Sequence, residues 1–179
     1  MSDLSLFYLL NGTAFQSETV DALILFSAIF LGYWVVTGVL FFCGISFFPR
    51  FSAFRQRNIR VCFESLAAGL AARFIVTELI RFFYSRPRPF EVLADVNILL
   101  YREGGGSFPS GHATFFFALA AGIAFHYPRV GVLFFAVALV ISFARVAAGV
   151  HWPSDILGGA MIGIATGFLA HAIIKRFLR

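Results

Sequence analysis

The chain has 179 residues, of which 60% are hydrophobic, 18% are aromatic and only 13% are charged. Together with a mean hydropathy of +0.87, this composition excludes a soluble multidomain enzyme. The apolar runs carry no alternating pattern of about ten residues, which argues against an outer-membrane barrel. We therefore expect an all-α integral membrane protein that folds as a single membrane-embedded domain over residues 1–179.

In chain order, apolar runs predict five transmembrane helices, at about residues 22–48, 59–83, 113–127, 130–144 and 156–174. The third and fourth runs reach spanning length only when they are extended to Ser110 and to Val150. This extension places His112 and Arg145 in terminal helical turns. The stretch 4–10 is apolar but too short to span the bilayer, so we predict an N-terminal interfacial helix there.

The charges in the loops predict the orientation, because short cytoplasmic loops collect Lys and Arg. One side of the predicted bundle carries eight basic residues and no acid: Arg50, Arg55, Arg57, Arg60, Arg129, Lys175, Arg176 and Arg179. We expect that side to be cytoplasmic, with the N-terminus outside and the C-terminus inside. The net charge of +5 therefore indicates topology, and we expect no nucleic-acid partner.

Three polar clusters fall at the helix ends that this topology places on the outer face. They are residues 81–89 (RFFYSRPRP), 109–112 (PSGH) and 145–155 (RVAAGVHWPSD). Because all three lie at ends of the same predicted bundle, we expect them to meet in space and to form one site.

The arginines of these clusters predict an anion site. Two prolines flank Arg88 and bias the chain toward extended geometry, so that Arg88 can fold back toward Arg81. With Arg145 added, three permanent charges converge, an arrangement that a bound phosphate stabilises. The alternative is that single arginines extend to lipid headgroups, and it applies most to Arg86 and Arg102.

The PSGH cluster offers a second means of binding an anion. Ser110 is expected to be the N-cap of a helix, and Gly111 permits close approach of the backbone. The amide groups at that helix start would then point into the same cavity as the arginines. His112 stands in the first helical turn, a place where a lone histidine is usually structural.

The third cluster pairs a histidine with an acid. His151 and Asp155 are four residues apart, so the carboxylate can fix the tautomer and the orientation of the imidazole. The other ring nitrogen is then available to attack phosphorus, which describes covalent phosphoryl transfer. The alternative is a metal site made of His112, His151 and Asp155, but three nearby guanidinium groups would oppose a divalent cation.

At these residues the sequence resembles the type 2 phosphatidic acid phosphatase superfamily of metal-independent lipid phosphatases. The family pattern is Lys, six residues, Arg-Pro; then Pro-Ser-Gly-His; then Ser-Arg, five residues, His, three residues, Asp. The residues in these positions are Arg81, Arg88, Pro89, 109–112, Arg145, His151 and Asp155. The chain departs from the pattern at Arg81, which replaces Lys, and at Ala144, which replaces Ser.

The resemblance implies a role for each residue. His151 would attack phosphorus and form a phosphohistidine, Asp155 would orient it, and His112 would protonate the leaving oxygen and later activate water. The groups that would bind the phosphoryl oxygens are Arg81, Arg88, Arg145, Ser110 and Gly111. The resemblance implies no cofactor and no metal ion.

The resemblance also implies an amphiphilic substrate at the outer face of a bacterial inner membrane, a lipid phosphate or diphosphate. The first choice is undecaprenyl diphosphate. Phosphatidylglycerophosphate, phosphatidate and lipid A phosphates are the alternatives. A non-enzymatic phospholipid-binding or transport protein would use the same arginines but gives His112 and His151 no role. A haloperoxidase, which would bind vanadate, is a third possibility.

Several further charged residues lie inside the second predicted helix. Glu64, Arg73 and Glu78 must face protein or water, because an unpaired charge in hydrocarbon is costly. Glu78 precedes Arg81 by three residues and is a candidate to hold that arginine in place. The sequence does not decide the partner of Arg73.

Two histidines and a glycine repeat lie outside the three polar clusters. His126 and His171 lie far from the predicted site and are expected to be structural. Gly159, Gly163 and Gly167 recur at every fourth position, which predicts close helix packing within the bundle.

Overall fold

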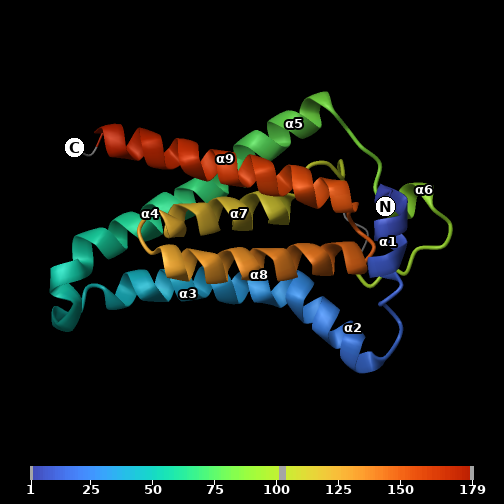
Figure 1. Ribbon diagram of the computed structural model, residues 1–179, viewed down its shortest axis with the longest axis horizontal. Coiled ribbons are helices and arrows are strands. Elements are labelled where there is room, and N and C mark those ends of the chain that lie inside the picture. The colour runs from blue at the N-terminus through green and yellow to red at the C-terminus, as the bar shows by residue number, and fades with distance from the viewer. Residues whose placement is uncertain (1, 101–103, 178–179) are drawn as a thin grey trace.

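The computed structural model describes residues 2–100 and 104–177, and every regular element in these ranges is a helix. Two further residues named above, Arg102 and Arg179, lie outside the described residues. The elements, shown in Figure 1, are α1 (Asp3–Asn11), α2 (Glu18–Leu25), η1 (Phe26–Phe30), α3 (Leu31–Ile45), η2 (Pro49–Phe54), α4 (Arg55–Ala71), η3 (Ala72–Val76), α5 (Thr77–Phe83), α6 (Pro89–Val92), α7 (Gly111–Ala124), α8 (Pro128–Ala147) and α9 (Pro153–Phe177).

The predicted helices are confirmed, with small shifts at their ends. The first begins at Glu18 rather than near residue 22, because the Ser17 side chain accepts a hydrogen bond from the backbone of Val20 and caps it. It ends at Ile45, ahead of Pro49. Two π-helical segments, η1 and η3, interrupt the first and second predicted helices without breaking them.

The helices identify an integral membrane protein. Among the described residues, three helical segments are long and apolar enough to cross a bilayer, residues 18–45, 128–147 and 153–177, and α7 is a shorter apolar helix. Large apolar side chains also cover the outside of the bundle, including Phe82, which is 82% exposed. The number of five transmembrane helices stays a prediction, as does the position of α1 in the membrane interface.

The core of the bundle forms around α7. This helix is buried along most of its length and contacts α4, α8 and α9. The repeat of Gly159, Gly163 and Gly167 belongs to α9 and lies where α9 packs against α7. A Cβ atom on Gly163 would come within 2.5 Å of the Thr114 carbonyl oxygen. The prediction of close packing within the bundle is therefore confirmed.

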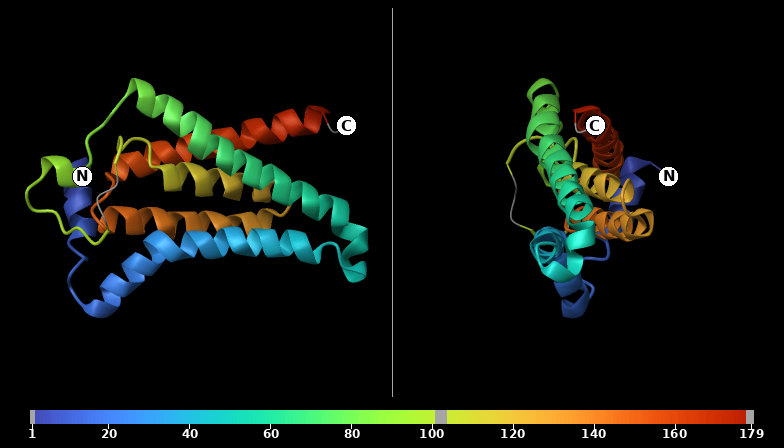
Figure 2. Two further views of the ribbon diagram at one scale, coloured as in Figure 1. Left: turned by 180° about the vertical axis from the view of Figure 1, so that it is seen from behind. Right: turned by 90° about the vertical axis from the view of Figure 1, so that its left-hand side faces the viewer.

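One end of the bundle is closed by α1 and by the long connection that follows α5 (Figure 2). Phe7 of α1 is fully buried and packs against the ring of Trp152. The Asn11 side chain donates hydrogen bonds to the carbonyl oxygens of Asn97, at 2.8 Å, and Ala147, at 2.9 Å. The N-terminal helix is thus joined to the loop and to α8 at this end.

Candidate active site

The three polar clusters lie at the same end of the bundle. The end of α5, the start of α7, the end of α8 and the start of α9 all meet there, on the side away from the C-terminus (Figure 1). Two hydrogen bonds to backbone carbonyl oxygens join them directly. The amide of Ser110 donates a hydrogen bond to the carbonyl oxygen of Asp155, and a guanidinium nitrogen of Arg81 donates to the carbonyl oxygen of Pro109 at 3.0 Å.

His151 and Asp155 face each other, with a serine beside them. The Nδ1 atom of His151 lies 3.5 Å from Oδ2 of Asp155 and 3.4 Å from the hydroxyl oxygen of Ser107. The Ser107 hydroxyl donates to the same carboxylate oxygen at 2.5 Å, and the amide of Trp152 donates to it at 2.8 Å. The imidazole therefore turns Nδ1 toward the acid and Nε2 away from it.

His151 is held in its neutral form. Its side chain is only 1% exposed, and this burial, the largest influence, lowers the pKa of the imidazole from 6.5 to about 4. The hydrogen bond with Asp155 raises the pKa, whereas the positive charges of Arg145 and Arg88 lower it. Two of the three predicted arginines therefore act electrostatically on the predicted nucleophile.

Arg88 is buried and fixed by backbone carbonyl groups from both sides. Its guanidinium donates to Val150 at 2.8 Å and to Gly105 at 3.2 Å, and its backbone amide donates to a carboxylate oxygen of Glu91. The last contact caps the short helix α6, which begins at Pro89. The position of Arg88 next to the His151 loop follows from these contacts.

Glu78 contacts two arginines. Its carboxylate lies 3.6 Å from Arg81 and forms a closer ion pair with Arg73. The expected proximity to Arg81 is present, and the partner of Arg73, which the sequence left open, is this same carboxylate. Arg73 and Arg81 thus share one acid next to the PSGH segment.

Ser110 occupies the N-cap position of α7, but its hydroxyl makes no capping hydrogen bond. The hydroxyl oxygen is buried and has no hydrogen-bond partner in the described part of the chain. Gly111, the next residue, lies against Arg73, because a Cβ atom at position 111 would come within 2.5 Å of Nε of Arg73. A buried hydroxyl group and a bare backbone therefore stand together at a helix start, where an anion is stabilised.

A cavity of about 490 Å³ opens beside this helix start. Gly111, His112, Arg145 and Arg73 line it together with apolar side chains of η1, α3, η3 and α7. His151, Arg81 and Arg88 are not among its lining residues. The predicted residues thus divide into a group that lines the cavity and a group that does not, and Arg145 belongs to the first while its charge acts on His151 of the second.

One alternative from the sequence is wrong. Arg86 does not extend to headgroups but donates to Oδ1 of Asp155 at 2.7 Å, to Ser154 at 2.6 Å and to Asp3 at 2.8 Å. The reason is that Asp155 turns only Oδ2 toward His151 and Ser107, which leaves Oδ1 for a cation. This contact also opposes the alternative of a metal ion on Asp155, because a guanidinium already neutralises the carboxylate.

The sequence reasoning missed Ser107, and it assigned no function to Arg73 or Arg86. Ser107 lies two residues before the PSGH segment, outside the family pattern, and no spacing in the sequence relates it to Asp155. The signal that could have found Arg73 is a lone cation inside an apolar helix, which is costly unless it faces a polar cavity.

Comparison with protein families decides the class of this bundle. The family model described as the PAP2 superfamily matches residues 64–179, more than half of the chain. The chain belongs to the PAP2 superfamily. It is therefore a membrane-embedded phosphatase, and the resemblance drawn from its motifs is confirmed. The possibility of a protein without enzymatic activity is set aside.

Similar PAP2 proteins cover nearly the whole chain. The putative undecaprenyl-diphosphatase YbjG of Escherichia coli is 33% identical over 173 residues, 96% of this chain and 82% of its own. The undecaprenyl-diphosphatase BcrC of Bacillus subtilis is 27% identical over 92% of this chain and 80% of its own. The crystal structure of Aquifex aeolicus LpxE superposes with a TM-score of 0.73 at 26% identity and covers 94% of each chain.

Proposed function

We propose that the protein hydrolyses undecaprenyl diphosphate to undecaprenyl phosphate and inorganic phosphate, through a phosphohistidine on His151 and without a metal ion. The observation that carries the proposal is the buried, neutral His151 with Asp155 behind it and the charges of Arg88 and Arg145 beside it. The choice of lipid is supported by two similar proteins that are named as undecaprenyl-diphosphatases.

In the first step Nε2 of His151 attacks the terminal phosphorus, and the bond from phosphorus to the bridging oxygen breaks. His112 donates a proton to that leaving oxygen and releases undecaprenyl phosphate. In the second step His112 accepts a proton from water, and the water oxygen attacks phosphorus. The bond from phosphorus to nitrogen breaks, and inorganic phosphate leaves the restored enzyme.

Five groups are proposed to hold the phosphoryl oxygens in both steps. They are Arg81, Arg88, Arg145, the Ser110 hydroxyl and the Gly111 amide. Their contribution is electrostatic, because three oxygens carry the charge of the transferred group and buried donors stabilise that charge more strongly than water does. The proposed role of Glu78 is to hold Arg81 in place through their contact at 3.6 Å.

The cavity supports a lipid substrate. Its walls are mostly apolar and come from η1, α3 and η3, while Gly111, His112 and Arg145 stand at its polar part. An isoprenoid chain lying between these helices would leave the diphosphate next to the start of α7. Arg73 lines the same cavity and is placed to contact the phosphate that stays with the lipid.

We also propose a location. The basic loops between the first two helices and at the C-terminus predict a cytoplasmic face, so the PSGH end lies at the opposite, periplasmic or extracellular face of a bacterial inner membrane. Five transmembrane helices with α1 in the interface complete this arrangement. Lipid phosphates on the outer face are then the accessible substrates.

The test is release of inorganic phosphate by purified protein in detergent with excess chelator. The panel compares undecaprenyl diphosphate with phosphatidylglycerophosphate, phosphatidate and a lipid A 1-phosphate by their kcat/KM values. We expect undecaprenyl diphosphate to be preferred at least about tenfold, a difference of about 1.4 kcal/mol. Protein quenched in alkaline detergent should carry base-stable, acid-labile phosphate on nitrogen, and His151→Gln should carry none.

Each other outcome overturns a stated part of the proposal. A preference for one of the other lipids would replace the substrate and keep the mechanism. Activity that disappears with chelator and returns with added metal would contradict the metal-independent mechanism. Phosphate release that survives in His151→Gln would remove His151 as the nucleophile.

A further inference from the structure

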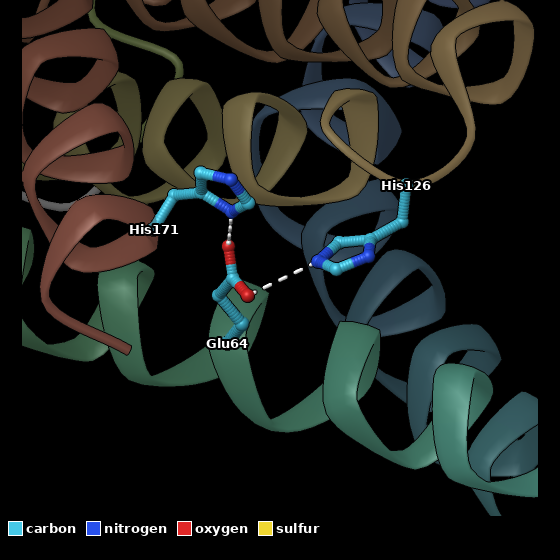
Figure 3. Close-up of side chains that lie close together, drawn as sticks. All are labelled: Glu64, His126 and His171. Atoms are coloured by element: carbon cyan, nitrogen blue, oxygen red, sulfur yellow. Dashed lines mark hydrogen bonds and ion pairs between the residues drawn. The ribbon is translucent and has the colours of Figure 1, made fainter. Parts of the chain in front are cut away.

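A second polar cluster lies at the other end of the bundle, away from the PSGH segment. Glu64 from α4, His126 from the α7–α8 connection and His171 from α9 converge there (Figure 3). Nε2 of His126 lies 3.0 Å from one carboxylate oxygen of Glu64, and Nδ1 of His171 lies 2.5 Å from the other. Three segments far apart in the sequence thus direct nitrogen and oxygen atoms at one point.

The charge of Glu64 at this point requires compensation. Its side chain is only 1% exposed, and in residues 2–100 and 104–177 its ion-pair partners are the two imidazoles alone. An imidazole is neutral or positive according to pH, so it is a weaker and less constant partner than a guanidinium. A divalent cation between the three side chains would accept a lone pair from each of them and balance the charge of the carboxylate.

The donor atoms suit a particular class of cation. One ligand atom from each of the three residues lies within 4.8 Å of the others. Two imidazole nitrogens and a carboxylate oxygen are ligands of zinc and of related divalent transition ions, and three such ligands leave a position for water. We propose that Glu64, His126 and His171 bind one such ion, with Zn²⁺ as the ion that this donor set suits best.

The surrounding contacts hold the ligands in place. The ring of His171 stacks on Phe125, with centroids 4.0 Å apart and planes 7° apart, which fixes the plane of the imidazole. Binding needs a lone pair on Nε2 of His126 and on Nδ1 of His171, so the proton of each neutral ring moves to its other nitrogen. Both rings are partly exposed, and those other nitrogens can then exchange hydrogen bonds with solvent.

The bound ion would join three elements of the bundle, of which α4 and α9 already pack against α7 and against each other. A single ion at this point links α4, the α7–α8 connection and α9, and it stabilises the folded bundle because the unfolded chain does not hold the three ligands together. The site contains none of the residues proposed for phosphoryl transfer, so its effect is on stability rather than on the chemical step.

The test uses a variant whose only histidines are His126 and His171. In the double variant His112→Gln/His151→Gln, purified in detergent and desalted after exposure to Zn²⁺, elemental analysis should find about one zinc ion per chain. Glu64→Gln and His171→Gln in the same background should bind zinc at least about tenfold more weakly. Glu18→Gln, which removes an exposed acid elsewhere, is the matched control and should keep the full stoichiometry.

A second measurement covers the case in which a variant folds poorly. In the wild-type chain, added Zn²⁺ should raise the Tm and chelator should reverse the increase. Co²⁺ in place of Zn²⁺ should give visible absorption bands that the Glu64→Gln variant lacks. If the double variant His112→Gln/His151→Gln binds no zinc, the three side chains form only a proton-sharing His–Glu–His cluster, and the proposal is overturned. Equal zinc binding by the parent, Glu64→Gln and His171→Gln would assign the metal to adventitious surface contacts, which also overturns it.

Discussion

The two ends of the bundle bury charge of opposite sign. At the PSGH end, Arg88 and Arg145 are buried together with Asp155, which also meets Arg86. At the other end, the buried group is Glu64, and its partners in the described residues are two imidazoles. The 14 residues of α7 separate the ends by about 20 Å. One short helix therefore keeps a region suited to anions apart from a region suited to cations.

The largest expected effect is at the PSGH end. Replacing His151 by Gln removes the proposed nucleophile and should lower phosphate release roughly ten-thousand-fold, because the proposed covalent intermediate forms on this residue. The measurement is kcat for undecaprenyl diphosphate in detergent, with size-exclusion chromatography to establish that the variant is folded. A folded variant that keeps even one hundredth of the activity would break the assignment of chemistry to this end.

Ser110→Ala sharpens the assignment of the anion site. The Ser110 hydroxyl is buried and makes no hydrogen bond in the described structure, so its removal should leave the Tm nearly unchanged. If it binds a phosphoryl oxygen, kcat/KM should fall about 100-fold. The matched control is Ser65→Ala, a buried serine of α4 whose hydroxyl donates to the Cys62 carbonyl. A loss of stability without loss of activity would contradict the proposed role.

Ser107→Ala tests the contact that joins His151 and Asp155. Without the hydroxyl, the carboxylate loses one donor and the imidazole loses a neighbour at 3.4 Å. We expect kcat to fall about tenfold, equivalent to about 1.4 kcal/mol, with little change in KM. Ser107→Thr retains a hydroxyl and should recover most of the activity. Failure of this rescue, or a change confined to KM, would count against a positioning role.

The last expected effect is on stability rather than on activity, and it depends on pH. The pKa of His151 is about 4 in the folded protein against 6.5 as its ordinary value, so below pH 6.5 the unfolded chain binds the proton more readily. His151 therefore costs the folded state on the order of 2 kcal/mol by pH 5. Wild-type protein should lose Tm faster than His151→Gln between pH 6.5 and 4. Parallel curves for the two proteins would show that His151 is not buried in its neutral form.

The sequence predicted the helices and the meeting of the three polar clusters because these depend on local information. Apolar runs bounded by Pro, Gly and charge determine where helices start and end, and motif order with helix parity places 81–89, 109–112 and 145–155 at one end. The glycines at every fourth position predicted close helix packing within the bundle for the same reason, and the structure identifies the partner helix as α7.

What could not be predicted depends on contacts between distant segments. Arg86 meets Asp3, 83 residues away, and Ser107 meets Asp155, 48 residues away, and no spacing rule links such pairs. The two π-helical segments also have no sequence signal. For His126 and His171 the expectation was a structural role, because nothing in the sequence relates either of them to Glu64.

The contacts of Asp3 have a practical consequence for handling the protein. Its carboxylate accepts hydrogen bonds from the Ser154 amide at 2.9 Å, the Ser154 hydroxyl at 2.6 Å and Arg86 at 2.8 Å. The first helix, α1, therefore supports the turn that carries Asp155. An affinity tag fused directly before Asp3, or a trimmed N-terminus, would disturb the turn that carries Asp155, whereas a tag after Phe177 would lie at the far end of α9 and leave that turn intact.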